Sequence, residues 1–350
     1  MKEITIGKRR IGPKHPPFII AEMSGNHNQS LNRAMEIVEA AAKSGVHALK
    51  LQTASPDGLT LNVDHPDFLI DDPASPWAGR NLYELYKEAV TPWEWHKPLF
   101  ERCNELGLTV FSSAFELSAI DLLEELDAPC YKIASFELID LPLIRKAAST
   151  GKPLIMSTGM ASVSDIHDAL RAAKGEGNDN IILLKCTSSY PATAADANIA
   201  TIPHLREMFG FQVGLSDHTL GIGVPCAAAA LGATVIEKHF TLKRSDGGVD
   251  ATFSLEPHEF AALVEESERA WASVGNILYG GAEVEQSSLK FRRSLYIARN
   301  LKEGDTLTEE NLRVVRPGYG LAPKYIDVLL GRKINQDLKA GTAMKWEFIG

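Results

Sequence analysis

The feature of the sequence that most limits its fold is a regular alternation between short apolar runs and stretches of helical periodicity, beginning near residue 17. This alternation is typical of parallel β/α units. Eight units favour a closed (β/α)8 (TIM) barrel over an open doubly wound sheet. The expected strands cover residues 18–23, 48–52, 109–113, 131–135, 154–157, 181–187, 212–216 and 235–240.

The chain has 350 residues, and such a barrel takes about 250, which leaves room for one small extra domain. After Gly280 and Gly281 the pattern changes to short strands and turns. We expect a catalytic barrel over 1–282, a charged linker over 283–293 and a small β-rich domain over 294–350. A module of that size has a marginal core, so we expect it to pack on a barrel, its own or a partner's.

Composition excludes several classes of protein. A formal net charge of -9 argues against a nucleic-acid partner, because phosphate binding needs a basic face. No apolar run of about 18 residues and no secretory leader is present, which predicts a soluble protein that is neither membrane-bound nor exported. Four cysteines without CxxC spacing suggest reduced thiols in the cytoplasm, and they are Cys103, Cys130, Cys186 and Cys226.

Polar and ionisable side chains stand at the end of every expected strand. In a (β/α)8 barrel the carboxyl ends of the strands carry the active site, so these side chains should meet at one mouth. In chain order they are Glu22, Lys50, Gln52, Ser112, Ser113, Lys132, Ser135, Glu137, Ser157, Thr158, Lys185, Thr187, Ser188, Tyr190, Ser216, His218, Glu237, Lys238 and His239.

The lysines and histidines of this set suggest the ligand. Lys50 and Lys132 stand inside apolar strands, so each needs a buried counter-charge, although a strand-end lysine is more often a solvated surface charge. Together with Lys185, Lys238 and the hydroxyls, they suggest a ligand carrying phosphate and carboxylate. His218 and His239 could hold a divalent metal, or each could simply cap its strand.

Other residues near the mouth, and one long connection, allow more than one interpretation. Glu22 and Glu137 suit proton transfer, although Glu137 could instead cap the following helix. The loop after the last strand should bring Asp250 over the mouth. His27 could orient a ligand, but we expect it to stabilise its own loop. The long connection 53–90 is either a lid or binding loop, or a decorative insertion.

Seven motifs in order resemble the sialic acid synthase family over essentially the whole chain. The C-terminal module resembles that family's antifreeze-protein-like (SAF) domain. Three stretches, 22–29, 91–98 and 316–325, most resemble the pseudaminic acid synthase branch. The motifs are Ala21-Glu-Met-Ser-Gly-Asn-His-Asn28, Tyr131-Lys-Ile-Ala-Ser135, Ser157-Thr-Gly-Met160, Cys186-Thr-Ser-Ser-Tyr-Pro191, Gly214-Leu-Ser-Asp-His-Thr219, Glu237-Lys-His-Phe-Thr241 and Arg316-Pro-Gly-Tyr-Gly320.

The resemblance implies an activity and roles for individual residues. The branch condenses phosphoenolpyruvate with 2,4-diacetamido-2,4,6-trideoxy-altrose and water, and releases phosphate by C–O cleavage. The product is a nonulosonate for flagellin or surface glycans, made by a cytoplasmic, domain-swapped homodimer. The implied sites are Mn²⁺ or Mg²⁺ on His218 and His239; phosphoenolpyruvate on Lys50, Gln52, Ser113, Lys132, Ser135, Ser157, Ser188 and Ser216; and the sugar on Glu22, Tyr190, Asp250 and the partner subunit's Arg316.

Three positions depart from the family pattern, and other activities stay open. Ser113-Ala114 replaces a common Thr-Pro, Ser188 replaces an asparagine of the sialic acid branch, and Val249 replaces a common proline. The alternatives are a sialic or legionaminic acid synthase, a metal-dependent aldolase on the same barrel, and a non-catalytic carbohydrate- or ice-binding protein.

Overall fold

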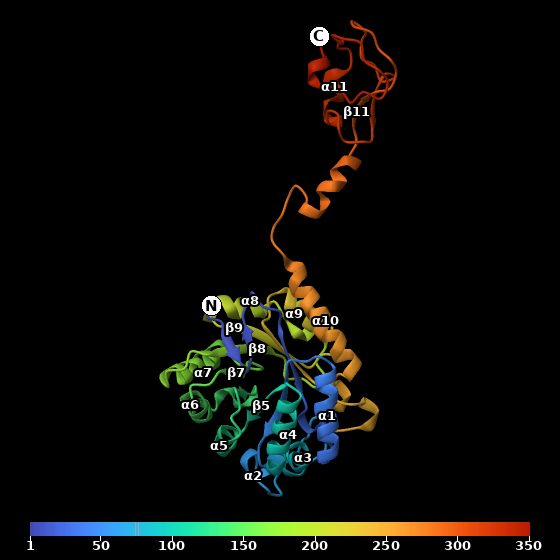
Figure 1. Cartoon of the computed structure of the whole chain (residues 1–350). Helices are drawn as coiled ribbons and strands as arrows, with labels where there is room; N and C mark the ends of the chain where they lie inside the picture. The colour runs from blue at the N-terminus through green and yellow to red at the C-terminus, as the bar shows by residue number, and fades with distance from the viewer. Residues whose placement is uncertain (74, 76) are drawn as a thin grey trace. The chain divides into compact units, whose positions relative to one another are not determined.

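The computed structural model of the chain describes residues 1–73, 75 and 77–350. The chain divides into two compact units, Met1–Val274 and Gly275–Gly350 (Figure 1). The first unit carries the barrel, and the second carries the small β-rich module.

Eight parallel strands close into a barrel within the described part of the first unit, which confirms the predicted fold. The observed strand ends differ from the predicted ones by two residues at most. The largest difference is at β6, where Ser135 already precedes a 3₁₀ helix, η3 (Phe136–Ile139). In chain order the barrel strands are β3 (Phe18–Glu22), β4 (Ala48–Thr53), β5 (Thr109–Ala114), β6 (Tyr131–Ile133), β7 (Leu154–Ser157), β8 (Ile181–Cys186), β9 (Gln212–Asp217) and β10 (Val235–His239).

Alternation along each strand divides its side chains between two cores. In β10, Val235 belongs to the cluster inside the barrel, whereas Ile236 packs in the larger cluster between strands and helices. Because the period is two residues, Glu237 and His239 share the inward face with Val235. The strand therefore carries a hydrophobic residue at the bottom of the barrel and ionisable groups at its upper end.

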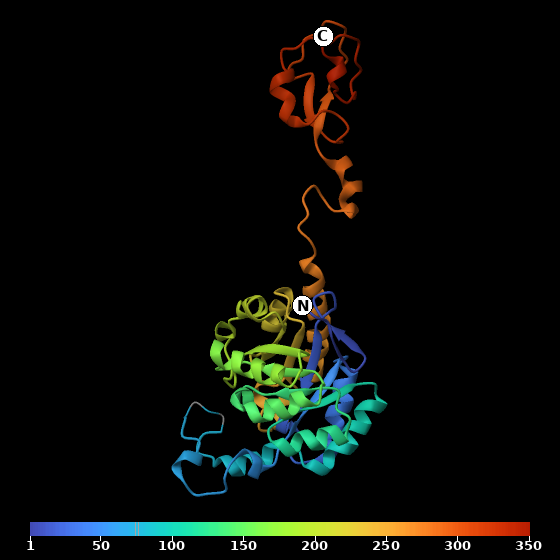
Figure 2. The same ribbon diagram turned by 90° about the vertical axis from the view of Figure 1, so that its left-hand side faces the viewer.

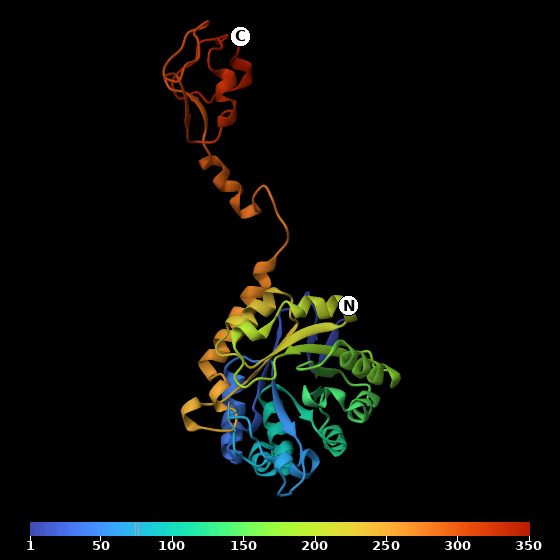
Figure 3. The same ribbon diagram turned by 180° about the vertical axis from the view of Figure 1, so that it is seen from behind.

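Helices surround the strands, as Figures 1 and 3 show. Side-chain oxygens of Ser30, Asp140 and Ser162 accept backbone N–H bonds at three of the helix starts. None of the helices in the described ranges is long and apolar enough to cross a bilayer. The helices following barrel strands are α1 (Leu31–Lys43), α4 (Trp93–Glu105), α5 (Leu117–Glu125), α6 (Leu141–Ser149), α7 (Val163–Gly175), α8 (Thr201–Phe209), α9 (Gly223–Ala230) and α10 (Pro257–Val274).

A short antiparallel hairpin, absent from the sequence expectations, precedes the barrel. It pairs β1 (Ile4–Ile6) with β2 (Arg9–Ile11). Its isoleucines belong to the same core cluster as Phe18 at the start of β3, and Gln212 at the start of β9 donates to the Lys2 carbonyl oxygen. The hairpin therefore covers the end of the barrel opposite the strand carboxyl ends.

The long connection after β4 leaves the barrel and returns to it through two short helices, α2 (Pro56–Leu59) and α3 (Leu82–Ala89); it is drawn in light blue in Figure 2. Gln29 Nε2 donates to the carbonyl oxygens of Glu88 and Val90, at 2.9 Å and 3.0 Å. These bonds tie the end of the insertion to the loop after β3.

The second unit has its own small core. It contains the antiparallel pair β11 (Ser294–Ile297) and β12 (Leu312–Val315), and one short helix, α11 (Ile326–Leu329). Most of the expected linker forms a 3₁₀ helix, η7 (Glu283–Phe291). Leu301 and Leu338 exchange backbone hydrogen bonds and are both buried in the core.

Glycine at one position of β9 is required by packing inside the barrel. A Cβ added to Gly214 would lie 2.3 Å from the Val235 carbonyl oxygen of β10. We expect Gly214→Ala to lower the free energy of unfolding by about 1–3 kcal/mol, because the two strands must separate. Gly175→Ala is the matched control, since nothing lies within 4 Å of its added Cβ. Equal unfolding midpoints in urea for the two variants would contradict this.

Candidate active site

A cavity of about 570 Å³ opens at the carboxyl ends of the barrel strands. Its walls include residues from every barrel strand or the loop that follows it. Most of the site residues expected from sequence lie around it, namely Glu22, Lys50, Gln52, Ser113, Lys132, Ser135, Glu137, Ser157, Tyr190, Ser216, His218, His239 and Asp250.

Two lysines and two glutamates form the floor of this cavity. Lys50 Nζ lies 3.0 Å from Glu22 Oε2 and 3.0 Å from Glu237 Oε1. Lys132 Nζ lies 3.3 Å from the same Glu237 oxygen. Each lysine is 1% exposed, so the counter-charge that its burial requires is provided by carboxylates of β3 and β10. We call these four residues the charged floor.

The charges of the floor stabilise one another. Burial alone would raise the pKa of Glu22, but Lys50 and His239 hold that pKa well below its usual range. Burial would also lower the pKa of Lys50, yet Glu22 and Glu237 raise it above its ordinary value. Burial dominates at Lys132 and lowers its pKa, although Glu237 partly offsets this. The floor therefore keeps Lys50 cationic and Glu22 ionised near neutral pH.

The floor retains donors for a ligand. An ammonium group has three N–H donors, and two of those on Lys50 and one on Lys132 face carboxylates. Ser113 and Ser157 each present a buried hydroxyl that has no hydrogen-bond partner among the described residues. Because such groups are costly to leave unpaired, the spare donors indicate a site for an oxygen-rich anion.

Lys185 and Lys238 do not line the cavity, which corrects the expectation of four lysines around it. Lys185 Nζ donates to the carbonyl oxygen of Cys186 and to Thr187 Oγ1. Lys238 is buried on the outer side of β10, where its Nζ lies 2.7 Å from Asp217 Oδ2. The two-residue period of the strands explains both positions.

Two histidines from adjacent strands form one corner of the cavity. The rings of His218 and His239 lie 5.3 Å apart. His218 Nδ1 is 2.9 Å from the Thr187 carbonyl oxygen, so the proton of the neutral ring lies on Nδ1 and the lone pair on Nε2. His239 Nε2 lies 3.3 Å from Glu22 Oε2, and its buried Nδ1 has no hydrogen-bond partner in the described chain.

This donor set fits a divalent cation. Two imidazoles beside a carboxylate suit Mn²⁺, and they also accommodate Mg²⁺ when other oxygens complete its coordination. Among the described residues, no three His, Cys, Asp or Glu side chains already surround one point. His218 and His239 would thus hold the ion together with water or substrate oxygens.

The loop after β10 brings Asp250 to the same corner. Its Oδ2 lies 3.6 Å from His239 Nδ1 and accepts a short hydrogen bond from Ser24 Oγ. Asn26 fixes this loop by donating to Phe240 and Ser254. His27 is fully buried and accepts a bond from the Gln29 backbone N–H, so it stabilises its loop as expected.

Aromatic side chains cover the histidine corner. The ring of Tyr190 lies 4.4 Å from that of His218 and 5.7 Å from that of Trp77. Trp77 belongs to the insertion, and its Nε1 donates to the Val249 carbonyl oxygen at 3.0 Å. The insertion therefore forms part of the cavity wall, which favours a binding role over decoration.

Glu137 faces the cavity instead of capping a helix. The N-cap of α6 is Asp140, whose carboxylate accepts the Leu143 N–H. One oxygen of Glu137 is buried without a hydrogen-bond partner among the described residues. Burial raises the pKa of Glu137 to about 7, so the protonated acid is available near neutral pH.

The raised pKa of Glu137 predicts a measurable pH dependence of stability. The folded state binds this proton more tightly than the unfolded state, so stability falls as pH rises from about 4.5 to about 7. We expect Glu137→Gln to gain about 2 kcal/mol relative to the original chain between about pH 5 and about pH 8. Urea unfolding of both proteins at the two pH values checks this, and a difference that does not change with pH would contradict it.

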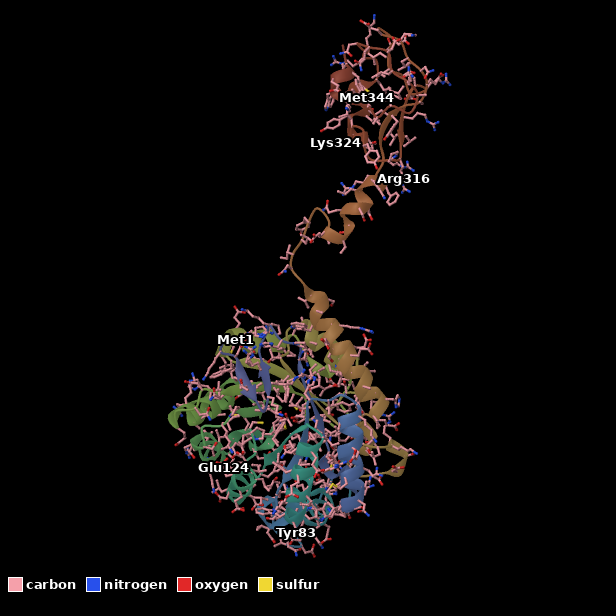
Figure 4. The ribbon with its side chains drawn as sticks, in the orientation of Figure 1. Met1, Tyr83, Glu124, Arg316, Lys324 and Met344 are labelled. Atoms are coloured by element: carbon pink, nitrogen blue, oxygen red, sulfur yellow. The ribbon has the colours of Figure 1, made fainter. Side chains whose placement is uncertain are left out.

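Two residues that the resemblance assigns to substrate, and three other strand-end hydroxyls, do not line the cavity in the described structure; the three are Ser112, Thr158 and Thr187. Ser188 is not among the residues that line the cavity, although its Oγ lies 3.9 Å from the Sγ of Cys186, which does line it. Arg316 lies in the second unit (Figure 4). Glu237 was expected at the mouth from the sequence, but its role as the counter-charge of both lysines was not assigned, although the need of Lys50 and Lys132 for a buried carboxylate was a signal for it.

The fold and this cavity define a (β/α)8-barrel protein with a candidate anion site beside a candidate metal corner. Comparison with known proteins agrees: the sequence pattern of the NeuB family matches residues 37–279, and that of the SAF domain matches residues 292–349. The chain belongs to the NeuB family.

Individual relatives cover nearly the whole chain. It is 43% identical over 333 residues to "Pseudaminic acid synthase" of Helicobacter pylori, covering 94% of this chain and 96% of the relative. It is 37% identical to "N,N'-diacetyllegionaminic acid synthase" of Legionella pneumophila, covering 95% and 94%. The crystal structure of a Leptospira borgpetersenii N-acetylneuraminic acid synthetase in complex with citrate matches with a TM-score of 0.73 and 33% identity, covering 83% of this chain and 96% of that one.

Proposed function

We propose that the protein is a nonulosonic acid synthase, and specifically a pseudaminic acid synthase that joins phosphoenolpyruvate to 2,4-diacetamido-2,4,6-trideoxy-altrose with release of phosphate. The observation that carries the proposal is the charged floor, in which two buried lysines keep free donors beside the unpaired hydroxyls of Ser113 and Ser157. The floor suits a small donor that bears both phosphate and carboxylate.

The residues of the floor position the donor. Lys50 and Lys132 offset the charge of phosphoenolpyruvate, and the serine hydroxyls donate to its oxygens. Carbon C3 of the enol then attacks the aldehyde carbon of the open-chain sugar, water adds to C2, and the C2–O bond to phosphate breaks. The reaction requires C3 and the aldehyde carbon to be held together at the strand ends. The residues of the floor therefore contribute mainly through positioning and electrostatics.

The aldehyde belongs at the histidine corner. A divalent cation on His218 and His239 would supply Lewis acidity toward the carbonyl oxygen. Tyr190 and Asp250 border this corner and would orient the sugar. Arg316 of a partner subunit is a further proposed sugar contact, within a domain-swapped homodimer located in the cytoplasm.

The two candidate acid–base residues differ in protonation, and this difference suggests their roles. Glu137, with a pKa of about 7, suits the donor of a proton to the new hydroxyl group. Glu22 is held ionised by Lys50 at 3.0 Å, so it suits the orientation of the attacking water through an accepted hydrogen bond, because its lowered pKa makes it a weak base.

Phosphate release and product mass test the proposal together. The purified protein is incubated with phosphoenolpyruvate, Mn²⁺ and either the altrose, the corresponding legionaminic precursor or N-acetylmannosamine. We expect one phosphate per nonulosonate and the highest kcat/KM with the altrose. A preference for another acceptor would replace the branch assignment, and a carbon–carbon product without phosphate would support an aldolase instead.

A further inference from the structure

One side of the cavity is formed by the insertion and contributes none of the residues of the charged floor. From the insertion, the residues lining it are Ala54, Leu59, Ile70, Trp77, Leu82, Leu85, Tyr86, Ala89 and Val90. All are apolar or aromatic. The same segment carries charged side chains such as Asp57, Glu84 and Lys87, none of which is among the lining residues in the described structure.

Burial and a backbone hydrogen bond hold this side of the cavity in place. Leu85 on α3 is buried, and Leu82 and Ile70 are half-buried while facing the cavity. Ile70 is fixed by a backbone bond from its N–H to the Arg80 carbonyl oxygen at 2.9 Å. We call Leu59, Ile70, Leu82, Leu85, Tyr86 and Val90 the apolar wall.

The apolar wall is poorly suited to the anionic donor. A phosphate or carboxylate placed against it would lose its hydration without gaining donors, apart from the single hydroxyl of Tyr86. The donor is matched by the charged floor at the strand ends. This leaves the wall for the acceptor, which is the second substrate of the proposed function.

We infer that the apolar wall of the insertion determines acceptor specificity, by packing against a deoxygenated terminal carbon and N-acyl methyl groups and by rejecting a hydroxyl at the same place. The inference rests on the proposed function, because it takes an amino sugar as the acceptor. A hydroxyl buried against Ile70 or Leu82 would have no partner, whereas a methyl group would fill the space.

A binding experiment tests the wall without requiring turnover. The probes are two N-acetylated amino-sugar alditols that differ only in a methyl or a hydroxymethyl group at carbon 6 and cannot react, because the aldehyde is reduced. Calorimetric titration of the full chain, saturated with phosphoenolpyruvate, should give roughly 10- to 100-fold tighter binding of the methyl compound. Equal affinities, or tighter binding of the hydroxymethyl compound, would overturn the inference.

Substitutions in the apolar wall test whether it causes the difference in affinity between the two alditols. Ile70→Thr and Leu82→Gln each introduce a hydrogen-bonding group, and we expect each to reduce the affinity ratio by about tenfold. Leu61→Asn is the control, since Leu61 lies in the same insertion, is 61% exposed and does not line the cavity. An unchanged ratio in both wall variants would overturn the inference.

The result separates the inference from the proposed function. Discrimination between the alditols without phosphate release from the corresponding aldoses would contradict the synthase activity and support the wall. Phosphate release with both aldoses at equal kcat/KM would support the synthase and contradict the wall.

Discussion

Lys50→Met should lower kcat/KM for phosphoenolpyruvate by roughly 10³-fold, the largest effect that we expect from a single substitution. Lys50 joins Glu22 and Glu237, and removing it leaves two carboxylates facing each other in a buried site. The same change should lower the free energy of unfolding by about 3–5 kcal/mol. Steady-state kinetics and urea unfolding measure the two effects.

A second variant separates catalysis from folding. In Lys50→Met with Glu237→Gln, one buried charge is removed together with its counter-charge, so we expect part of the stability to return while the activity stays low. Lys152→Met is a control at the other end of the barrel, where Lys152 precedes β7 and pairs with Glu124 at 2.7 Å. Activity that recovers together with stability in the double variant would show that Lys50 acts only as a structural charge.

The histidine corner gives the second large prediction. We expect the protein to bind one Mn²⁺ and His239→Ala to bind it at least about 100-fold more weakly, because one of two imidazole ligands is lost. Calorimetric titration of the metal measures this without any turnover. His96→Asn is a control, since His96 is buried away from the cavity and bonds to Thr53 Oγ1.

Two results would contradict a catalytic metal on the histidines. One is full turnover of His218→Ala and of His239→Ala after treatment with a chelator, and the other is unchanged Mn²⁺ affinity in both variants. Loss of turnover with unchanged Mn²⁺ affinity would instead assign the two rings to substrate contacts.

The barrel could be predicted from the sequence because its strands are buried on both faces and therefore form continuous apolar runs. In a closed parallel barrel, the carboxyl ends of all strands lie at the same end. Glu22, Lys132 and His239 were therefore expected around one mouth before their distances were known. The N-terminal hairpin was missed because its strands have only three residues each.

Other features of the site depend on three-dimensional neighbours. Lys132 on β6 and Glu237 on β10 are not on adjacent strands, so no local pattern indicates their ion pair. The outward position of Lys238 could have been predicted from the sequence. Consecutive residues of a strand point to opposite faces, and His239 was expected to point inward. Leu82, Leu85 and Tyr86 of the apolar wall share one face of α3 at helical spacing, so that part could have been predicted, whereas Leu59 and Ile70 follow no such period.

The fate of oxygen from water labelled with ¹⁸O shows directly whether phosphoenolpyruvate reacts at carbon or at phosphorus. If water adds to C2 and the C2–O bond breaks, mass spectrometry should find one label in the nonulosonate and none in the released phosphate, once slow exchange of the product is subtracted. Label in the phosphate would mean attack at phosphorus. That result would contradict the arrangement in which the charged floor holds phosphoenolpyruvate for reaction at its carbon atoms.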